Sequence, residues 1–192
     1  MRGQERSPGL IDAIFEHGLW RTAGGGYYSS FLGHKLAVRI IEDDLSSPEV
    51  AQLLSEHLDG MARHTPPESV HALDINGLRA ADITFWTVWD GECLLGCGAL
   101  KELDTRHGEV KSMRTARRYL RRGVAEAMLQ HLIDVSRARH YARLSLETGS
   151  GPAFAAADSL YRKFGFYDCG PFGSYRDDPF SRFMTLELDA AD

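Results

Sequence analysis

The stretch from Gly108 to Met128 most constrains how this chain can fold. It begins with alternating apolar and polar residues, passes through a bend dense in arginine, and continues beyond Gly123 as an amphipathic helix. The first N–H groups of a helix lack intrahelical partners, and that end carries partial positive charge. Because glycine lets a ligand approach the backbone closely, this unit predicts a binding site for a phosphate or pyrophosphate group.

Composition places the chain among ordinary soluble proteins. Its 192 residues, 43% hydrophobic and 26% charged, suffice for one substantial domain. The net charge of −5 argues against a general nucleic-acid binder. Neither a membrane-spanning apolar stretch nor the apolar core of a secretory signal is evident, and the three cysteines do not form a disulfide framework. We therefore expect a reduced cytoplasmic protein without nucleic-acid or membrane partners.

Residues 1–35 differ from the rest and are interpreted as a peripheral N-terminal arm or leader. Apolar residues between Leu10 and Leu19 fall at helical spacing, and three consecutive glycines follow them. The arm could also pack on a partner chain, so a homodimer is one expectation. The domain itself is expected to span residues 36–192.

Within that domain, strands and helices are expected to build an α+β fold with a mixed sheet. Ser46 or Ser47 can cap a helix that has Pro48 at its first position. Asp90-Gly91 predicts a hairpin turn. The expected strands are 36–41, 83–89, 93–103, 109–114, 143–147, 166–169 and 182–188, and the expected helices begin near 48, 123 and 153.

The strand before the arginine bend is predicted to follow a strict alternation of faces. Lys111 and Met113 should share the face of Glu109, and Arg114 should share that of Val110.

Two motifs in the correct order resemble those of the GNAT superfamily of acyl-CoA-dependent N-acetyltransferases. Leu120-Arg121-Arg122-Gly123-Val124-Ala125 resembles the pyrophosphate loop, although Leu120 replaces the usual Arg or Gln. Leu160-Tyr161-Arg162-Lys163-Phe164-Gly165-Phe166 resembles the signature of the last helix, although Phe154 stands where many members have Asn. The stretches 147–149, 171–173 and 178–179 resemble uncharacterised bacterial members of the YsnE type.

The resemblance, which covers about residues 36–188, implies a GNAT-like, mostly antiparallel sheet flanked by helices. It also implies acetyl-CoA as cosubstrate. The backbone of Met113 and Thr115 is expected to contact the pantetheine arm as an added strand. The phosphates are expected at Arg121, Arg122, Gly123, Val124, Ala125 and Glu126.

For catalysis, the resemblance implies that the hydroxyl of Tyr161 protonates the departing thiolate. Tyr161 could instead be a core aromatic, because it falls at helical spacing with other apolar residues. Glu109 is the expected base, with Glu147, His71 or a water relay as rivals, and Glu109 could also be a surface carboxylate. The Cys and His residues show no metal-ligand spacing, so no metal is expected.

These observations predict an N-acetyltransferase that moves an acetyl group from acetyl-CoA to an amine of a small molecule or peptide. The amine would attack directly in a ternary complex. A non-catalytic acyl-CoA sensor on the same fold is the main alternative, and transfer to a hydroxyl or of a longer acyl chain is a third. The sequence leaves the acceptor open.

Overall fold

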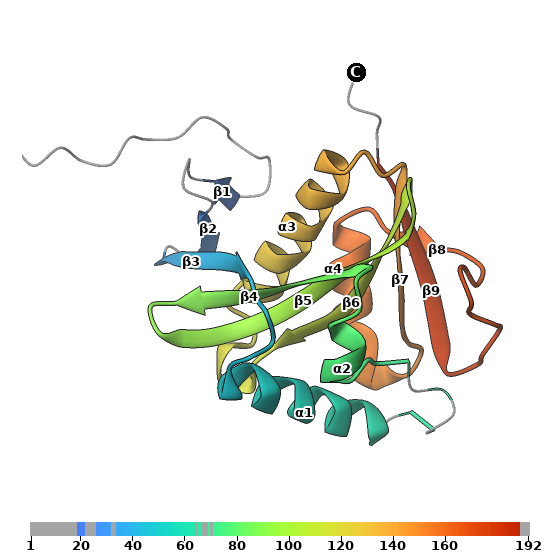
Figure 1. The fold of residues 1–192 in the computed structure, drawn as a ribbon, viewed down its shortest axis with the longest axis horizontal. Coiled ribbons are helices and arrows are strands. Elements are labelled where there is room, and N and C mark those ends of the chain that lie inside the picture. The colour runs from blue at the N-terminus through green and yellow to red at the C-terminus, as the bar shows by residue number, and fades with distance from the viewer. Residues whose placement is uncertain are drawn as a thin grey trace, which may run out of the picture.

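A single twisted sheet runs through the computed structural model, which describes residues 19–21, 26–31, 34–63, 65, 66, 69 and 71–188 (Figure 1). In these residues the strand order is β1-β2-β3-β4-β5-β6-β7-β9-β8, and only β6 and β7 pair in parallel. The strands are β1 (Leu19–Arg21), β2 (Gly26–Phe31), β3 (His34–Glu42), β4 (Ile83–Asp90), β5 (Cys93–Asp104), β6 (His107–Thr115), β7 (Arg143–Gly149), β8 (Tyr167–Asp168) and β9 (Ser181–Glu187).

Helices lie on both faces of this sheet. The longer ones, α1 and α3, begin where local sequence signals predict: the Ser47 hydroxyl accepts from the Val50 N–H at 3.2 Å to cap α1, and Gly123 precedes α3. The helix expected from 153 is split into a short 3-10 turn and α4. The helices are α1 (Pro48–Ala62), α2 (Ile75–Leu78), α3 (Val124–Ala138) and α4 (Ala155–Lys163), with 3-10 turns η2 (Arg117–Tyr119) and η3 (Pro152–Phe154).

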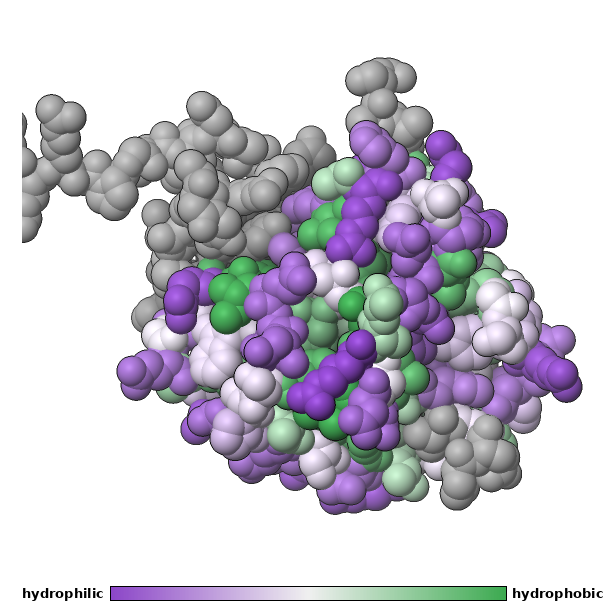
Figure 2. All heavy atoms as spheres, viewed as in Figure 1, coloured by the Kyte–Doolittle hydropathy of each residue, from purple (hydrophilic) through white to green (hydrophobic). Residues whose placement is uncertain are grey.

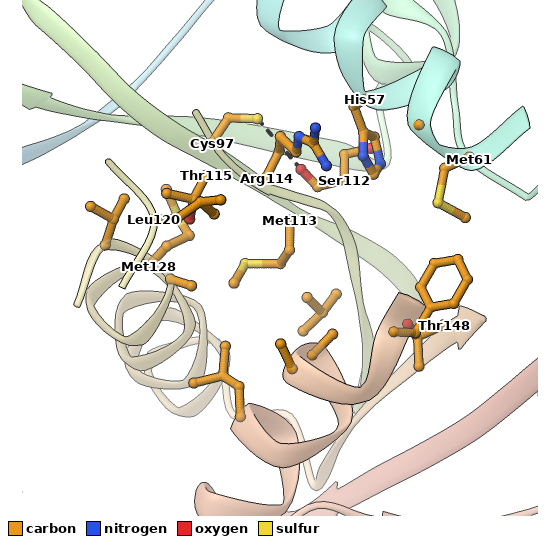
Figure 3. A pocket seen from close by; sticks show the side chains of 18 of the residues that line it. His57, Met61, Cys97, Ser112, Met113, Arg114, Thr115, Leu120, Met128 and Thr148 are labelled. Atoms are coloured by element: carbon orange, nitrogen blue, oxygen red, sulfur yellow. Dashed lines mark hydrogen bonds between the residues drawn. The ribbon is translucent and has the colours of Figure 1, made fainter. Parts of the chain in front are cut away.

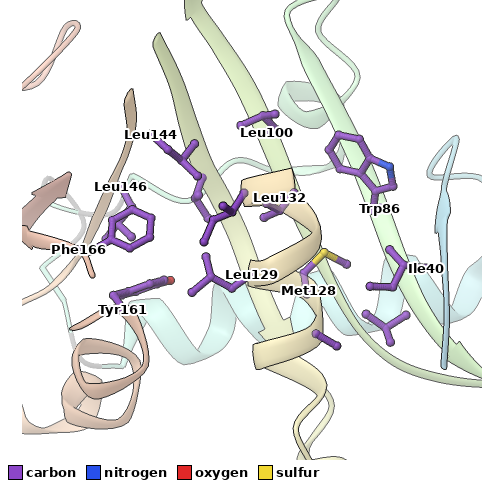
Figure 4. Close-up of a cluster of buried hydrophobic side chains, with 14 of the residues drawn as sticks. Ile40, Trp86, Leu100, Met128, Leu129, Leu132, Leu144, Leu146, Tyr161 and Phe166 are labelled. Atoms are coloured by element: carbon purple, nitrogen blue, oxygen red, sulfur yellow. The ribbon is translucent and has the colours of Figure 1, made fainter. Parts of the chain in front are cut away.

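Two apolar clusters, one on each face, hold the layers together. Alternation along β5 assigns Leu95 to the cluster with α3 and α4, and Leu94 to the cluster with α1 and α2. The first is the larger and surrounds Met128, Leu129 and Leu132 of α3 (Figure 4). The α+β class and the mostly antiparallel sheet expected from the sequence are thereby confirmed.

The N-terminal segment contributes two strands that the sequence did not indicate. β1 pairs with β2, and β2 continues the sheet at the edge of β3. Most of the amphipathic helix expected between residues 10 and 19 lies outside the described residues, and Leu19 itself begins β1. The division of the chain at residue 35 stays a prediction.

The surface of the described residues is mixed in character. Hydrophilic side chains dominate the face shown in Figure 2, with hydrophobic atoms visible in small areas between them. Among the helices that the structure describes, none has both the length and the apolar character to cross a membrane.

Candidate active site

The parallel strands β6 and β7 pair over only part of their length. Their register runs from His107 opposite Arg143 to Val110 opposite Leu146 and then ends. β6 nevertheless continues to Thr115 and β7 to Gly149. The two strands therefore diverge, and on its β7 side the β6 backbone from Lys111 onward has no strand partner in the described sheet. An extended ligand can pair with such an edge.

A β-bulge at Ser112 coincides with this divergence. Cys97 pairs with Arg114 and Ala99 with Lys111, so β6 uses one residue more than β5 between the two pairs. Ser112 has φ = 51°, in the left-handed region that a non-glycine residue rarely adopts. Such a bulge bends its strand and shifts the side chains that follow.

The bulge overturns the predicted alternation of faces beyond Lys111. Met113 packs with Val110 on the α3 side instead of with Glu109. Arg114 extends toward α1, where its Nη1 lies 3.8 Å from the position that a Cβ of Gly60 would occupy. The prediction was wrong because one inserted residue exchanges the two faces of every later position.

The diverging strands open into a cavity of about 590 Å³. Its walls come from α1, from the segment before α2, from β6, from the turn that leads into α3, from the end of β7 and from α4 (Figure 3). The predicted residues that line it are His71, Met113, Thr115, Arg121, Gly123, Val124, Ala125, Glu126, Glu147 and Tyr161. Arg122 and Glu109 are not part of the lining: the Arg122 guanidinium lies 5.6 Å from the centre of the Tyr119 ring.

The start of α3 forms one end of the cavity. Gly123 caps the helix with φ = 81° and ψ = 2°, and no side chain caps it. The Gly123 carbonyl accepts from the Ala127 N–H at 2.9 Å, so the N–H groups of residues 124–126 precede the first intrahelical bond. With the positive end of the helix dipole, they suit an anionic group.

Tyr161 joins the core to the cavity. Its ring lies in the α3-side cluster, 5.8 Å from that of Phe166, and the residue is 6% exposed (Figure 4). Burial, and secondarily the charge of Glu147, raises the pKa of the Tyr161 hydroxyl above its usual value. The hydroxyl is therefore protonated at neutral pH, as a proton donor must be.

Glu109 is 2% exposed and already engaged. Its Oε1 accepts from Lys111 Nζ at 2.9 Å and from the Tyr175 hydroxyl at 2.5 Å. Lys111 also donates to the Tyr175 oxygen at 2.8 Å, which closes a triangle between the buried Glu109 and two partly buried polar groups. Tyr175 comes from the loop between β8 and β9, and its ring meets that of His71 edge-on at 5.0 Å.

Glu147 lines the cavity near the end of β7. Its Oε1 accepts from the Ser181 hydroxyl at 2.7 Å. Burial raises the pKa of Glu147 above its usual value, and the hydrogen bond from Ser181 and the charges of His71 and Lys111 oppose that rise. A carboxylate of raised pKa that faces a cavity suits proton transfer near neutral pH.

His57 is a cavity residue that the sequence analysis missed. It lies on α1 at helical spacing from the buried residues Val50, Leu53 and Leu54. A polar residue at helical spacing with these apolar residues was the signal in the sequence from which a functional role of His57 could have been inferred. Burial, and secondarily the charge of Arg114, lowers the pKa of His57 to about 4, so the imidazole is neutral at pH 7.

The match to known proteins agrees with this geometry. Residues 48–166 match the model of the acetyltransferase (GNAT) family. The chain belongs to the GNAT family. It is 56% identical over 146 residues to YsnE, an uncharacterized N-acetyltransferase of Bacillus subtilis (strain 168), which covers 76% of this chain and 97% of the relative. The resemblance to YsnE-type members is thus confirmed, and the family and the relative together support acyl transfer.

Solved structures share the fold at low sequence identity. A putative acyl-CoA N-acyltransferase from Klebsiella pneumoniae matches with a TM-score of 0.63 and 24% identity, over 79% of this chain and 97% of its own. A GNAT acetyltransferase from Elizabethkingia anophelis with acetyl-CoA bound matches with a TM-score of 0.55 and 17% identity, over 79% and 98%.

Proposed function

We propose that the chain is an N-acetyltransferase that transfers an acetyl group from acetyl-CoA to an amine by direct attack in a ternary complex. One observation carries the proposal. A single cavity combines an unpaired strand edge, a glycine-led helix start, a protonated tyrosine and a carboxylate of raised pKa. Acetyl-CoA fits the family, and a solved relative contains it.

The residues of the cavity fit this cosubstrate on two counts. The backbone of residues 111–115 would hold the pantetheine arm as an added strand. The N–H groups of residues 124–126 would hold the pyrophosphate, with Arg121 adding positive charge at the rim. Since backbone groups provide most of these contacts, Leu120 in place of the usual Arg or Gln costs little.

The bound thioester supplies the acetyl group and the leaving thiol. In the proposed reaction the amine nitrogen attacks the carbonyl carbon, and the C–S bond breaks with its electron pair passing to sulfur. Tyr161 donates its hydroxyl proton to that sulfur. Glu147 accepts the proton that the amine loses and returns one to the Tyr161 phenolate. The products are an acetamide and free coenzyme A.

We assign the base to Glu147 rather than to Glu109. Glu147 lines the cavity, lies close enough to Tyr161 to influence the pKa of its hydroxyl, and has one hydrogen-bond donor. Glu109 is buried between Lys111 and Tyr175 and is held as a charge partner. In this proposal Glu109 positions Lys111 and the Tyr175 loop beside the acceptor.

Calorimetry with acetyl-CoA, followed by a free-thiol assay on a panel of amines, tests the proposal. Binding together with amine-dependent thiol release is expected. Binding without turnover on any amine would instead favour the sensor alternative, and no binding would defeat both.

Tyr161→Phe tests the proton donor. We expect turnover to fall about 100-fold or more, the scale of general acid catalysis, while the Kd for acetyl-CoA changes less than about 3-fold because the phenyl ring keeps its packing. Unchanged turnover would remove Tyr161 from the mechanism. Tyr167→Phe, at an exposed tyrosine outside the cavity, is the matched control.

A further inference from the structure

The α1 side of the cavity carries polar atoms that lack partners. Within the described part of the chain, three atoms there are buried without a hydrogen bond: His57 Nδ1, Ser112 Oγ and Arg114 Nε. All three residues line the cavity, and Figure 3 shows Arg114 and His57 side by side with Ser112 next to them. We call these three residues the α1 wall. Buried polar groups are nearly always paired in folded proteins, so three together indicate a missing partner.

The charge of the α1 wall defines that partner. His57 is neutral at pH 7, because its pKa lies at about 4. The guanidinium of Arg114 is a cation and forms no ion pair with any carboxylate in the part of the chain that the structure describes. The nearby Lys111 is neutralised by Glu109 at 2.9 Å. The wall thus presents one uncompensated positive charge, a hydroxyl and an imidazole.

The phosphates of the cosubstrate do not suit this position. Their proposed site is the start of α3, and α3 packs on the opposite face of the sheet from α1 (Figure 1). Arg114 turns toward α1 because the bulge at Ser112 reverses its face. The α1 wall therefore lies on the side that remains for the acceptor.

We propose that the α1 wall binds a carboxylate of the acceptor, so that the substrates are small amines that also carry a carboxylate, such as amino acids. This inference rests on the proposed function. A guanidinium matches the two oxygens of a carboxylate, and Ser112 and neutral His57 add donors without further charge. One uncompensated cation balances a monoanion, whereas a phosphate dianion calls for more positive charge.

Matched acceptors test the inference on the wild-type protein. An aromatic, an aliphatic and a basic amino acid are each assayed as the free carboxylate, the primary amide and the aminophosphonate. For at least one scaffold, kcat/KM should be about 10- to 100-fold higher for the carboxylate than for the amide, the scale of a charged hydrogen bond. Equal rates for carboxylate and amide, or a preference for the phosphonate or for amines without an acid group, overturn it.

Variants locate the effect. Arg114→Gln should remove the preference for carboxylate over amide while leaving acetyl-CoA affinity within about 3-fold, and Arg114→Lys should restore part of it. Arg106→Gln, at an exposed turn residue outside the cavity, is the control. If Arg114→Gln does not fold, the assignment is still tested by Ser112→Ala, which should weaken the preference for carboxylate over amide, and by the acceptor series on the wild-type protein. A preference that survives in folded Arg114→Gln contradicts the assignment.

A binding measurement separates this inference from the proposed function. Calorimetry in the presence of coenzyme A should show that the N-acetyl amino acid of the best scaffold binds at least about 10-fold more tightly than its amide. If no amine is acetylated, the same titration is run with all three N-acetyl scaffolds. If none of the three N-acetyl amino acids binds more tightly than its amide, the assignment of the α1 wall as a carboxylate site is overturned. Preferential binding without any turnover counts against the proposed enzymatic activity and not against the carboxylate site.

Discussion

Gly123→Ala tests the anion site at the start of α3. Gly123 has φ = 81°, where an L-residue with a Cβ is strained by about 1–2 kcal/mol. Either the alanine keeps this conformation and the folded state loses that free energy, or the backbone rotates. In the second case the N–H groups of residues 124–126 turn from the positions that suit a phosphate.

Both consequences can be measured. For a domain of this size, strain of about 1–2 kcal/mol lowers Tm by roughly 2–8 °C. A hydrogen bond to a charged group contributes about 1.5–3 kcal/mol, so losing one weakens acetyl-CoA binding about 10- to 100-fold. The assays are thermal unfolding without ligand and calorimetry with acetyl-CoA. We expect at least one of the two losses to appear, and the affinity loss whenever the helix start rotates.

Two further variants separate the causes. Gly151→Ala is the matched control, because Gly151 has φ = −82° and an added Cβ would meet no atom within 4 Å. It should change neither Tm nor affinity appreciably. Gly123→Asn should fall between wild type and Gly123→Ala, since asparagine tolerates the left-handed region better. If Gly123→Ala matched the wild type in both Tm and affinity, the argument from the helix start would be refuted.

Three other predictions follow from the same region. Gly149→Ala brings a Cβ into steric overlap with one edge of the Phe154 ring, so urea unfolding should show a loss of about 1–3 kcal/mol in the free energy of unfolding. An unchanged midpoint contradicts this packing. The pKa of His57 is about 4 in the folded protein and 6.5 in the unfolded chain. Between these two pH values the unfolded state therefore binds more protons than the folded state. The free energy of unfolding should fall by up to about 3 kcal/mol as the pH drops from 6.5 to 4. His57→Gln should flatten that part of the stability curve, and an equal slope in both proteins refutes the assignment. Because the pKa of Glu147 is raised, kcat/KM should fall as the pH drops below that pKa. Glu147→Gln should lower kcat/KM strongly and abolish this fall at acid pH. A fall at acid pH that survives in the variant points to another base.

Local signals in the sequence predicted most elements. Pro48 after a serine cap starts α1, Gly91 at φ = 55° begins the two-residue turn that follows Asp90 between β4 and β5, and Gly165 follows α4 at φ = 89°. Each of these features depends on backbone preferences within a few residues, and a sequence shows such preferences directly.

The features that were missed depend on distant parts of the chain. Serine seldom adopts a positive φ, so its presence does not indicate a bulge. The bulge at Ser112 and the orientation of Arg114 toward α1 therefore could not be inferred from the alternation of apolar and polar residues. The engagement of Glu109 depends on Tyr175, which approaches from 66 residues away. The residues at the helix-start end of the cavity could therefore be named from two motifs, whereas those of the α1 wall required the assembled sheet.

The most direct test of the central claim is a crystal structure of the protein with coenzyme A bound. The account predicts pyrophosphate oxygens about 3 Å from backbone nitrogens of residues 124–126, the pantetheine arm along residues 111–115, and the sulfur facing the Tyr161 hydroxyl. Coenzyme A bound outside the divergence of β6 and β7, or with its sulfur remote from Tyr161, would contradict it.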